Sequence, residues 1–311
     1  MTHVLVTGAA GFIGSHTVDQ LLAAGHRVTG IDNFRTGRPA NLDAARRHLA
    51  FNLQKRDVTL PGELEAVIAD APPDVIIHLA ALVSVQESMA DPALNFSLNV
   101  QATHTVAEAA RRHRVPRVVF ASSAAVYGET FAGATAEDAP KKPISPYGAA
   151  KLASEALLLG HAAAFGFTVR CQRYFNVYGP RQDPASPYSG VISIFERRYR
   201  EGKPVTIYGD GRQTRDFISV HDVARANVLA ATRTDAPSGI ANICTGRATA
   251  LSEVAAIFNR HYPAVSPPTH APARPGDIQH SLGSPASAAA EIGFHAQVDI
   301  ATGLAELIGG G

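Results

Sequence analysis

The chain has 311 residues, of which 46% are hydrophobic and 18% charged, and this composition is typical of a globular rather than a disordered protein. Its 28 Lys and Arg side chains balance 27 Asp and Glu, so the net charge of +1 provides no basic surface for nucleic acid or an anionic membrane. No apolar run approaches the ~20 residues that cross a bilayer, and the first strand begins too early for a secretory leader to precede it. We therefore expect a cytoplasmic protein with neither nucleic-acid nor membrane partners.

Strand-like and helical segments alternate through the first 176 residues. The strands are predicted at 3–7, 27–32, 74–81, 117–123 and 168–176, and the helices at 12–24, 93–113 and 146–165. Such alternation is typical of parallel βαβ units, and strands that are almost continuously apolar indicate helices on both faces of the sheet. The sequence predicts an α/β fold with a doubly wound parallel sheet.

Beyond residue 176 the pattern becomes irregular and predicts a second, smaller α/β domain. Two long segments, "NVYGPRQDPASPYSG" and "SPPTHAPARPGDIQHSLGS", are rich in Pro, Gly and Ser, and loops of this length in a compact domain are usually functional. Between them, "DFISVHDVARANVLAAT" and "IANICTG" predict a helix and a strand that return to the large sheet. We therefore expect a large domain of residues 1–176 plus about 217–244. A discontinuous smaller domain would comprise about 177–216 plus 245–311.

A glycine-rich loop, "TGAAGFIG", joins the first strand to the first helix. Gly8, Gly11 and Gly14 follow a G-x-x-G-x-x-G spacing, which allows positive φ and close approach of another group to the main chain. The following helix N-terminus favours an anion such as a phosphate. Asp32 ends the next strand at the distance expected for a ribose-hydroxyl ligand. Together these features predict a dinucleotide site on a Rossmann-type sheet, rather than only a tight turn.

The carboxylate of Asp32 also bears on the choice of cofactor. It can accept hydrogen bonds from ribose hydroxyls but repels a 2′-phosphate, which favours NAD over NADP. Arg35 and Arg38 follow closely and offer an alternative, because an arginine beside the ribose can accommodate that phosphate. We interpret them as solvated loop charges.

A second constellation lies at the start of the predicted helix at 146–165, in "SPYGAAK". Tyr147 and Lys151 are four residues apart, so one helical turn places them on the same face. Ser145 is a suitable N-cap and Pro146 a suitable first helical residue. Upstream, "FASSAAVYG" places Ser122 and Ser123 at the carboxyl end of a strand, where ligands bind in open α/β folds. A tyrosine whose pKa is lowered by a neighbouring ammonium and a nicotinamide cation can act as a base, while a serine positions the substrate hydroxyl.

With these motifs, the sequence resembles the extended short-chain dehydrogenase/reductase family, and within it the nucleotide-sugar 4-epimerases of the UDP-galactose 4-epimerase type. The resemblance covers nearly the whole chain and rests on an ordered series of motifs: "TGAAGFIG", "DNF", "RDVTL", "HLAA", "SSAAVYGE", "YGAAK", "RYFNVYGPRQDP", "GDGRQTRDFISVHDVA" and "RPGD".

The resemblance implies NAD as cofactor and a role for each matching residue. Ser123 matches the catalytic hydroxyl, with Ser122 as the less favoured of the pair; Tyr147 matches the base, and Lys151 supports it. The implied cofactor-binding residues are Gly8, Gly11, Phe12, Ile13, Gly14, Asp32, Asn33, Asp57, Val58, Leu79, Ala80, Ala81, Asn99, Tyr147, Lys151 and Tyr174. The implied UDP-sugar-binding residues are Ser123, Asn176, Arg215, Arg274, Asp277 and Ser281.

Two positions bear on the reaction. Relatives that dehydrate or decarboxylate nucleotide sugars carry an acidic residue after the catalytic hydroxyl, whereas this chain has Ala124 and Ala125. This favours epimerisation at C4 by transient oxidation. At Ser281 a small side chain leaves room for an acetamido group, so UDP-GlcNAc and UDP-GalNAc are expected beside UDP-glucose and UDP-galactose, with UDP-glucuronate as an alternative. A serine that merely ends a turn there is the competing interpretation.

Further expectations complete this interpretation. Val83 replaces a lysine that contacts the cofactor in some relatives, which predicts weaker NAD binding. Cys171 and Cys244 are expected to be reduced, buried thiols, and no metal site is expected. His78 and His221 are expected to be structural or exposed. The helices at 93–113 and 146–165 match those that pair in family homodimers. The rival to an enzyme is a non-catalytic NAD-binding regulator, which usually lacks part of the Ser, Tyr and Lys set.

Overall fold

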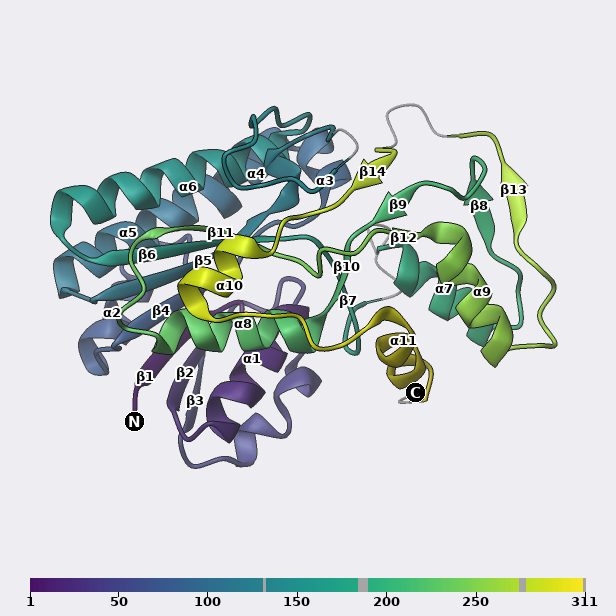
Figure 1. Cartoon of the computed structure of the whole chain (residues 1–311). Coiled ribbons are helices and arrows are strands. Elements are labelled where there is room, and N and C mark those ends of the chain that lie inside the picture. The colour runs from purple at the N-terminus through teal and green to yellow at the C-terminus, as the bar shows by residue number, and fades with distance from the viewer. Residues whose placement is uncertain (131–132, 184–189, 274–277, 310–311) are drawn as a thin grey trace.

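The larger half of the molecule is built on a seven-stranded parallel sheet (Figure 1). The computed structural model describes residues 1–130, 133–183, 190–273 and 278–309. The strand order is β3-β2-β1-β4-β5-β6-β11. The strands are β1 (His3–Thr7), β2 (Arg27–Asp32), β3 (Phe51–Lys55), β4 (Val75–His78), β5 (Arg117–Ser123), β6 (Thr168–Tyr174) and β11 (Gly239–Ile243). The predicted doubly wound α/β fold is thereby confirmed.

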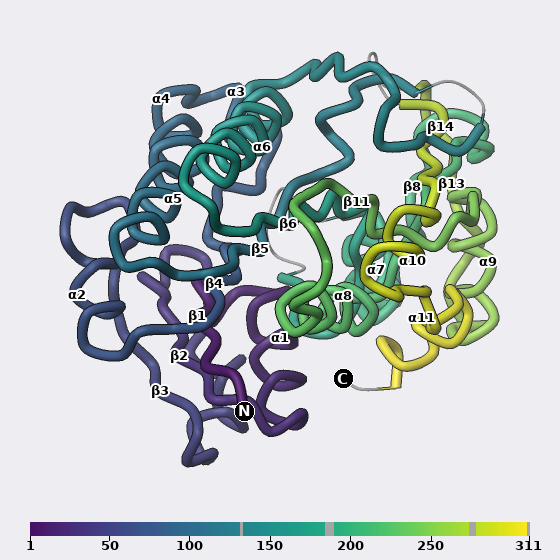
Figure 2. The backbone as a smooth tube through the Cα atoms, turned by 60° about the vertical axis from the view of Figure 1, so that its left-hand side comes forward, coloured from purple at the N-terminus to yellow at the C-terminus, as the bar shows by residue number. Residues whose placement is uncertain are grey.

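Helices cover both faces of this sheet (Figure 2). Alternate residues of β1 point to opposite faces, as the two-residue period of a strand requires: Val4 and Val6 belong to one apolar core and Leu5 to the other. The first core contains residues of α1 (Phe12–Ala23), α8 (Val220–Thr232) and α10 (Ala286–Ile292). The second contains residues of α2 (Glu63–Asp70), α5 (Ala102–His113) and α6 (Pro146–Phe165).

Most of the predicted elements of this half are present with small changes in their limits. The strand expected at 74–81 is β4, which ends at His78, and the helix at 146–165 is α6 with those same limits. The helix expected at 93–113 is a continuous helical segment in three parts: α4 (Pro92–Asn95), a π-helical turn (Phe96–Gln101) and α5. Strand β3, helix α2 and the short helix α3 (Val85–Ala90) were not predicted.

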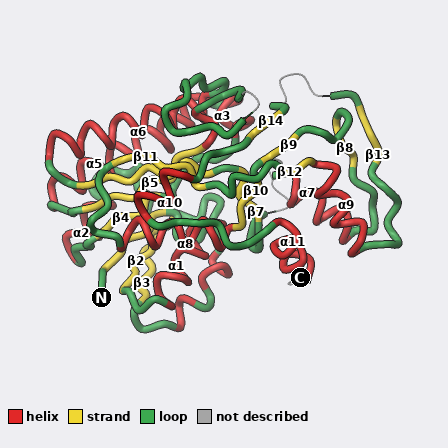
Figure 3. The backbone as a smooth tube through the Cα atoms, in the orientation of Figure 1, coloured by secondary structure: helices red, strands yellow, loops and turns green. Residues whose placement is uncertain are grey.

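The chain leaves the large sheet after Tyr174, two residues before the predicted end of that strand. It enters the smaller half, whose strands are only two or three residues long (Figure 3). These form three sheets: β7 (Asn176–Tyr178) with β10 (Phe217–Ser219); β8 (Thr206–Tyr208) with β13 (Thr269–Ala271); and β9 (Thr214–Arg215) between β12 (Thr249–Ala250) and β14 (His280–Ser281).

Three helices pack in the smaller half: α7 (Val191–Arg200), α9 (Leu251–His261) and α11 (Ile300–Gly309). Their shared core includes Phe195, Tyr199 and Phe258, with the Tyr199 and Phe258 rings stacked at a centroid distance of 5.3 Å. Before this half is complete, the chain returns through α8 and β11, and β11 pairs in parallel with β6 at the edge of the large sheet. The predicted return of a helix and a strand to the large sheet is confirmed.

Candidate active site

The glycine loop after β1 is shaped by close backbone contacts. Gly8 has φ +71°, and a Cβ there would lie 2.7 Å from the backbone nitrogen of Ala80. A Cβ on Gly14 would lie 2.0 Å from the carbonyl oxygen of Gly8, so helix α1 can approach the loop only without a side chain. Gly11 caps α1 without a side-chain hydrogen bond, and the first turn, which includes Phe12 and Ile13, has no acidic residue. A bound pyrophosphate fits such an opening.

Acidic and amide groups follow the ends of β2 and β3. Asp32 accepts hydrogen bonds from the backbone N–H groups of Ala10 (2.8 Å) and Phe34 (2.7 Å). Its burial raises the pKa of the carboxyl, and these two bonds oppose that shift. Asn33 Nδ2 donates to Asp57 Oδ2 (2.8 Å), and Val58 next to it is buried. Among the residues expected around the adenosine, Asn33 and Asp57 are thus bonded to each other, while backbone N–H groups hold Asp32.

The segment after β4 is hydrogen-bonded to Asn99 of the π-helical turn Phe96–Gln101. Leu79, Ala80 and Ala81 are half-buried, and the Ala80 N–H donates to Thr7 Oγ1 (3.2 Å). Asn99 is buried and its Nδ2 donates to the carbonyl oxygen of Leu82 (3.0 Å) and to Asn95 (2.8 Å). Its Oδ1 is a buried acceptor without a partner in the described part of the chain. An unsatisfied buried acceptor fits a ligand that donates a hydrogen bond there.

Tyr147, Lys151 and Ser123 meet where the start of α6 passes the end of β5. Ser145 Oγ accepts a hydrogen bond from the Gly148 N–H (3.1 Å) and Pro146 is the first helical residue, as the sequence predicts. Lys151 Nζ donates to the carbonyl oxygen of Ala121 (2.8 Å). Its burial lowers the pKa of Lys151 to about 7, while the charge of Glu155 opposes this.

The sequence analysis invokes two positive charges beside Tyr147, and the Lys151 ammonium alone does not lower the pKa of this tyrosine. Burial raises it, and a hydrogen bond with Ser123 opposes the rise. Lys151 Nζ lies 5.9 Å from the centroid of the Tyr147 ring and donates elsewhere, so the ammonium does not outweigh burial. A lowered pKa therefore requires a further positive charge beside the tyrosine.

Ser122 and Ser123 have different partners. Ser122 Oγ donates to Glu155 Oε1, whereas Ser123 Oγ accepts from the Ala125 N–H (3.2 Å) and is bonded to Tyr147. The serine that the resemblance favours is thus the one beside the tyrosine.

A buried charged network beneath these residues has no counterpart in the sequence analysis. Glu155 lies one turn after Lys151 and accepts from Arg173 Nε (2.8 Å) and Nη2 (2.7 Å) in a bidentate pair. Arg173 Nη1 donates to the hydroxyl of Tyr127 (2.8 Å), which donates to Asn242 (2.7 Å). Only the fold brings these residues together, because they lie on separate elements. The network ties α6, β5, β6 and β11 into one unit.

Tyr174 ends β6 in the core beside the site. Its hydroxyl donates to Asn227 Oδ1 (2.6 Å), and burial raises its pKa. Any cofactor contact of Tyr174 would therefore involve its ring rather than its hydroxyl.

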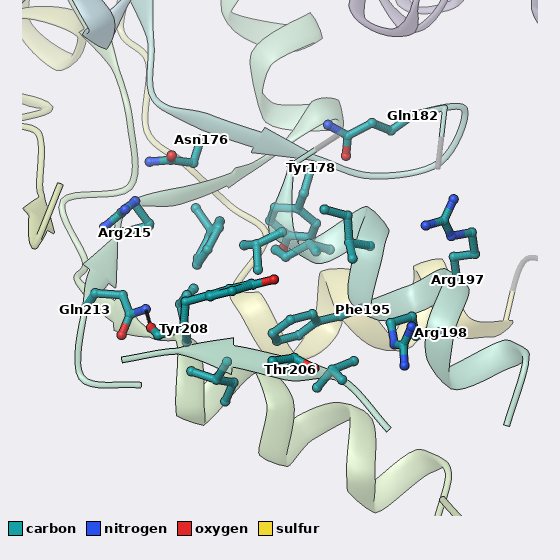
Figure 4. Close-up of a pocket in the computed structure, with 18 of the residues that line it drawn as sticks. Asn176, Tyr178, Gln182, Phe195, Arg197, Arg198, Thr206, Tyr208, Gln213 and Arg215 are labelled. Carbon is teal, nitrogen blue, oxygen red and sulfur yellow. Dashed lines mark hydrogen bonds between the residues drawn. The ribbon is translucent and has the colours of Figure 1, made fainter. Parts of the chain in front are cut away.

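A pocket of about 630 Å³ opens between the small sheets and α7 (Figure 4). Asn176 and Arg215 line it on one side in this view, with Arg197 and Arg198 at the other. Tyr208, Gln213 and Phe195 also line it, and none of these was singled out from the sequence. An aromatic and polar pocket with several arginines is suited to a nucleotide and its phosphates.

Ser281 lies beside this pocket wall, since it is in register with Arg215 in the parallel pair β14 and β9. Arg274 and Asp277 lie outside the described residues.

The remaining residues singled out from the sequence are paired, exposed or buried. Arg35 forms an ion pair with Glu87, and Arg38 with Asp183 (2.7 Å). Val83 is exposed. Cys171 and Cys244 are free and buried, as expected. His78 is buried, bonds to Thr7 Oγ1 (2.7 Å) and has its pKa lowered by burial to about 3, while His221 contacts Glu306 (2.9 Å).

Metal-ligand clusters and membrane-spanning helices are both absent from the described residues. These residues contain no group of three or more His, Cys, Asp or Glu side chains that could hold a metal ion. They also contain no helix with the length and apolarity needed to cross a membrane.

Comparisons with known proteins agree with this geometry. A family model described as the NAD dependent epimerase/dehydratase family matches residues 4–244. The UDP-glucose 4-epimerase of Mycolicibacterium smegmatis is 39% identical over 308 residues, covering 98% of this chain and 96% of that protein.

Solved structures match over almost the full chain. The UDP-N-acetylglucosamine 4-epimerase of Methanobrevibacter ruminantium, in complex with UDP-N-acetylmuramic acid, has a TM-score of 0.93 and 36% identity, covering 99% of this chain and 97% of that one. The UDP-glucose 4-epimerase of Thermus thermophilus, in complex with NAD, has a TM-score of 0.88 and 37% identity, covering 99% and 98%.

The Rossmann-type sheet, the glycine loop and the tyrosine–lysine helix define a dinucleotide-dependent α/β protein of the extended short-chain dehydrogenase/reductase type. More closely, the chain belongs to the NAD-dependent epimerase/dehydratase family. The predicted family and cofactor are confirmed. The residues fit NAD: the glycine loop leaves space for the pyrophosphate, and the Asn99 Oδ1 acceptor has no protein partner among the described residues.

Proposed function

We propose that the protein is a UDP-hexose 4-epimerase that interconverts UDP-glucose and UDP-galactose and also accepts UDP-GlcNAc and UDP-GalNAc. The observation that carries this proposal is the meeting of Ser123, Tyr147 and Lys151 at the carboxyl edge of the sheet. The pocket lined by Asn176 and Arg215 supports a substrate that is bound through its nucleotide diphosphate.

The three side chains have distinct roles in this proposal. Tyr147 removes the proton of the C4 hydroxyl and later returns one, while Ser123 holds that hydroxyl beside it. Lys151 stays near the tyrosine through its bond to the Ala121 carbonyl and favours the phenolate when charged. Bound NAD⁺ supplies the acceptor and then the donor of the C4 hydride, and its nicotinamide cation is the further charge that Tyr147 needs.

Separate groups of residues would bind NAD and the UDP part of the substrate. Gly8, Gly11 and Gly14 would hold the pyrophosphate of NAD, and Asp32 and Asn33 its adenosine ribose. Asn99 Oδ1 would accept a hydrogen bond from the cofactor. Asn176 and Arg215 would bind the UDP part of the substrate, and Arg274 and Asp277 keep that role from the resemblance alone. The hydrogen bonds of Asp32 to backbone N–H groups hold its carboxylate in place, which favours NAD over NADP.

The turn after Ser123 supports epimerisation rather than dehydration. Residues Ala124–Val126 form a 3-10 turn directly after the serine, and none of them has an ionisable side chain. Elimination from the sugar needs an acid or base near C5 or C6. The absence of a carboxylate on this turn supports oxidation and reduction at C4 rather than elimination.

The proposal on substrate range rests on the small side chain of Ser281. Ser281 is half-buried and lies in register with Arg215, so its small side chain borders the substrate wall. This supports acceptance of an N-acetyl group, with UDP-glucuronate as the alternative substrate.

The test is incubation of the purified protein, without added cofactor, separately with UDP-galactose, UDP-GalNAc and UDP-glucuronate, followed by ion-exchange separation of the C4 epimers. Conversion of the first two is expected. Conversion of UDP-galactose alone would refute the proposed acceptance of N-acetyl sugars. Conversion of UDP-glucuronate alone would favour the alternative substrate. No turnover even with NAD⁺ added would favour the non-catalytic regulator.

We also propose that the enzyme is a cytoplasmic homodimer. Met89, Phe96 and Phe165 on helices α3 to α6 are more than half exposed, at 61%, 58% and 53%. Exposed apolar side chains on one group of helices are suited to a partner surface. Light scattering at micromolar concentration should report twice the chain mass, and a monomer would contradict the homodimer.

A further inference from the structure

Asp216 is a fully buried carboxylate between β9 and β10, directly after the pocket residue Arg215. Its Oδ1 accepts hydrogen bonds from the Thr245 N–H (2.8 Å) and hydroxyl (2.6 Å). Its Oδ2 accepts from the N–H groups of Gly246 (3.0 Å) and Gly283 (3.2 Å). No arginine or lysine in the described ranges forms an ion pair with it, so neutral donors alone hold this buried charge.

The backbone of Asp216 makes further contacts to residues of the substrate wall. Its N–H donates to the carbonyl oxygen of Ser281 (2.7 Å). Its carbonyl oxygen accepts from both the backbone N–H (3.1 Å) and the side-chain Nδ2 (3.1 Å) of Asn176. One residue therefore contacts β7, β14 and the segment after β11.

We propose that Asp216 is a positioning residue that holds Asn176, Arg215 and Ser281 in one geometry and thereby sets the affinity for the nucleotide sugar. The inference rests on the proposed function, because it assigns these three residues to the substrate. Asn176 and Arg215 lie on the same side of the pocket in Figure 4. Asp216 itself does not line that pocket, so it acts through them.

The neighbourhood of Asp216 leaves little room for another arrangement. Gly246 has φ +72°, which favours glycine. A Cβ on Gly283 would lie 2.7 Å from both Cys244 Sγ and the Phe175 ring, so this segment is packed against the end of the large sheet. The strands that meet here are two or three residues long, and their own ladders provide few hydrogen bonds. The carboxylate therefore supplies fixed contacts that the short strands lack.

Asp216 must be a carboxylate because its side chain is the acceptor in all four of its hydrogen bonds. In Asp216→Asn the shape is kept, but the amide presents N–H groups toward N–H donors on one side, and at least one donor loses its acceptor. The expected result is a rise of about tenfold in the Kd for UDP and in the KM for the UDP-sugar, since losing one bond to a charged group is of that size. kcat should stay within about twofold because Tyr147 and Lys151 belong to the other half.

Asp222 provides the matched control. It is 1% exposed, against 0% for Asp216, and accepts from the backbone N–H groups of Gln297 (2.9 Å) and Val298 (2.9 Å), as well as from Arg225. It joins α8 to the segment after α10 and does not line the pocket. Asp222→Asn should lower the melting temperature while leaving both the Kd for UDP and the KM unchanged.

Calorimetry of UDP binding, steady-state kinetics and thermal unfolding of both variants and the wild type test the proposal. An unchanged Kd and KM in Asp216→Asn, with only a lower melting temperature, would overturn it, as would a loss confined to kcat. If Asp216→Asn does not fold, Thr245→Val is the test instead, because it removes one hydrogen-bond donor and keeps the charge of Asp216. A smaller rise in the Kd for UDP is then expected, and an unchanged Kd would refute the positioning role. A wild type that turns over no UDP-sugar would refute the proposed function separately.

Discussion

Two buried carboxylates, Glu155 in the larger half and Asp216 in the smaller, are satisfied in different ways. Glu155 faces the guanidinium of Arg173 in a bidentate ion pair, on a helix of 20 residues packed against a seven-stranded sheet. Asp216 accepts hydrogen bonds from N–H and hydroxyl donors and forms no ion pair within the described ranges, between strands of two or three residues. The larger half thus holds the proposed catalytic residues through extensive packing and a charged pair. The smaller half depends on one acceptor for the position of its binding groups.

The largest expected effect separates turnover from binding. Tyr147→Phe should lower kcat by about 10²–10⁴-fold, because general acid–base catalysis contributes that much. The Kd for UDP should not change, since the pocket residues belong to the smaller half. Steady-state assays of C4 epimerisation measure kcat, and calorimetry measures the Kd for UDP. Tyr199→Phe is the control, because that hydroxyl bonds to Asn259 away from the pocket, and retained activity in Tyr147→Phe would refute the base assignment.

The ion pair of the larger half can be tested by removing one charge or both. Arg173→Met should lower the free energy of unfolding by about 3–5 kcal/mol, because Glu155 is left as an uncompensated buried charge. The double variant Glu155→Met with Arg173→Met should recover most of that loss. Denaturant unfolding gives both values. A single variant as stable as the wild type would show that the pair does not hold this region.

In the smaller half, Gly246→Ala should cost about 1–2 kcal/mol of stability, since an alanine is strained at φ +72°. It should also raise the Kd for UDP, because the Gly246 N–H is one of the donors to Asp216. Gly25→Ala is matched in strain, with φ +78° and open space around its Cβ, and should leave the Kd unchanged. Equal Kd values in the two variants would contradict the link between Asp216 and the pocket.

The smallest expected effect is a dependence of stability on pH. Lys151 has a pKa of about 7 in the folded protein against 10.5 when exposed, so between these values the unfolded chain binds the extra proton. Stability should therefore rise with pH above 7, by up to about 1 kcal/mol per pH unit. Unfolding of the wild type at pH 7.0 and 8.5 measures this slope. Lys151→Met should lack it, and identical slopes in the two proteins would disprove the assignment.

Local sequence signals predicted the larger half well. The glycine loop, the capped start of α6 and the alternating strands are encoded by neighbouring residues, so Gly8, Ser145 and Tyr147 could be identified before the structure. Strand β3 was missed because "FNLQK" is only partly buried and lacks the apolar run of the other strands.

The contacts that hold the site together could not be predicted, because they join distant residues. Glu155 and Arg173 are 18 positions apart on different elements, and Asp216 and Gly283 are 67 apart. The strands of the smaller half are too short to show a periodic pattern, so Tyr208 and Gln213 gave no signal as pocket residues. The raised pKa of Tyr147 depends on burial, which spacing along the sequence does not reveal.

The return of the chain to the large sheet has a consequence for folding during synthesis. Strand β11 and helix α8 are made only after β7 to β10 of the smaller half, yet β11 covers the edge of β6 and α8 packs against α1. A nascent chain that ends near residue 176 therefore exposes an unpaired strand edge and an uncovered apolar face, both of which promote aggregation. The buried residues of the second core all precede residue 172, whereas the first core is completed only after α8 and α10 have been synthesised.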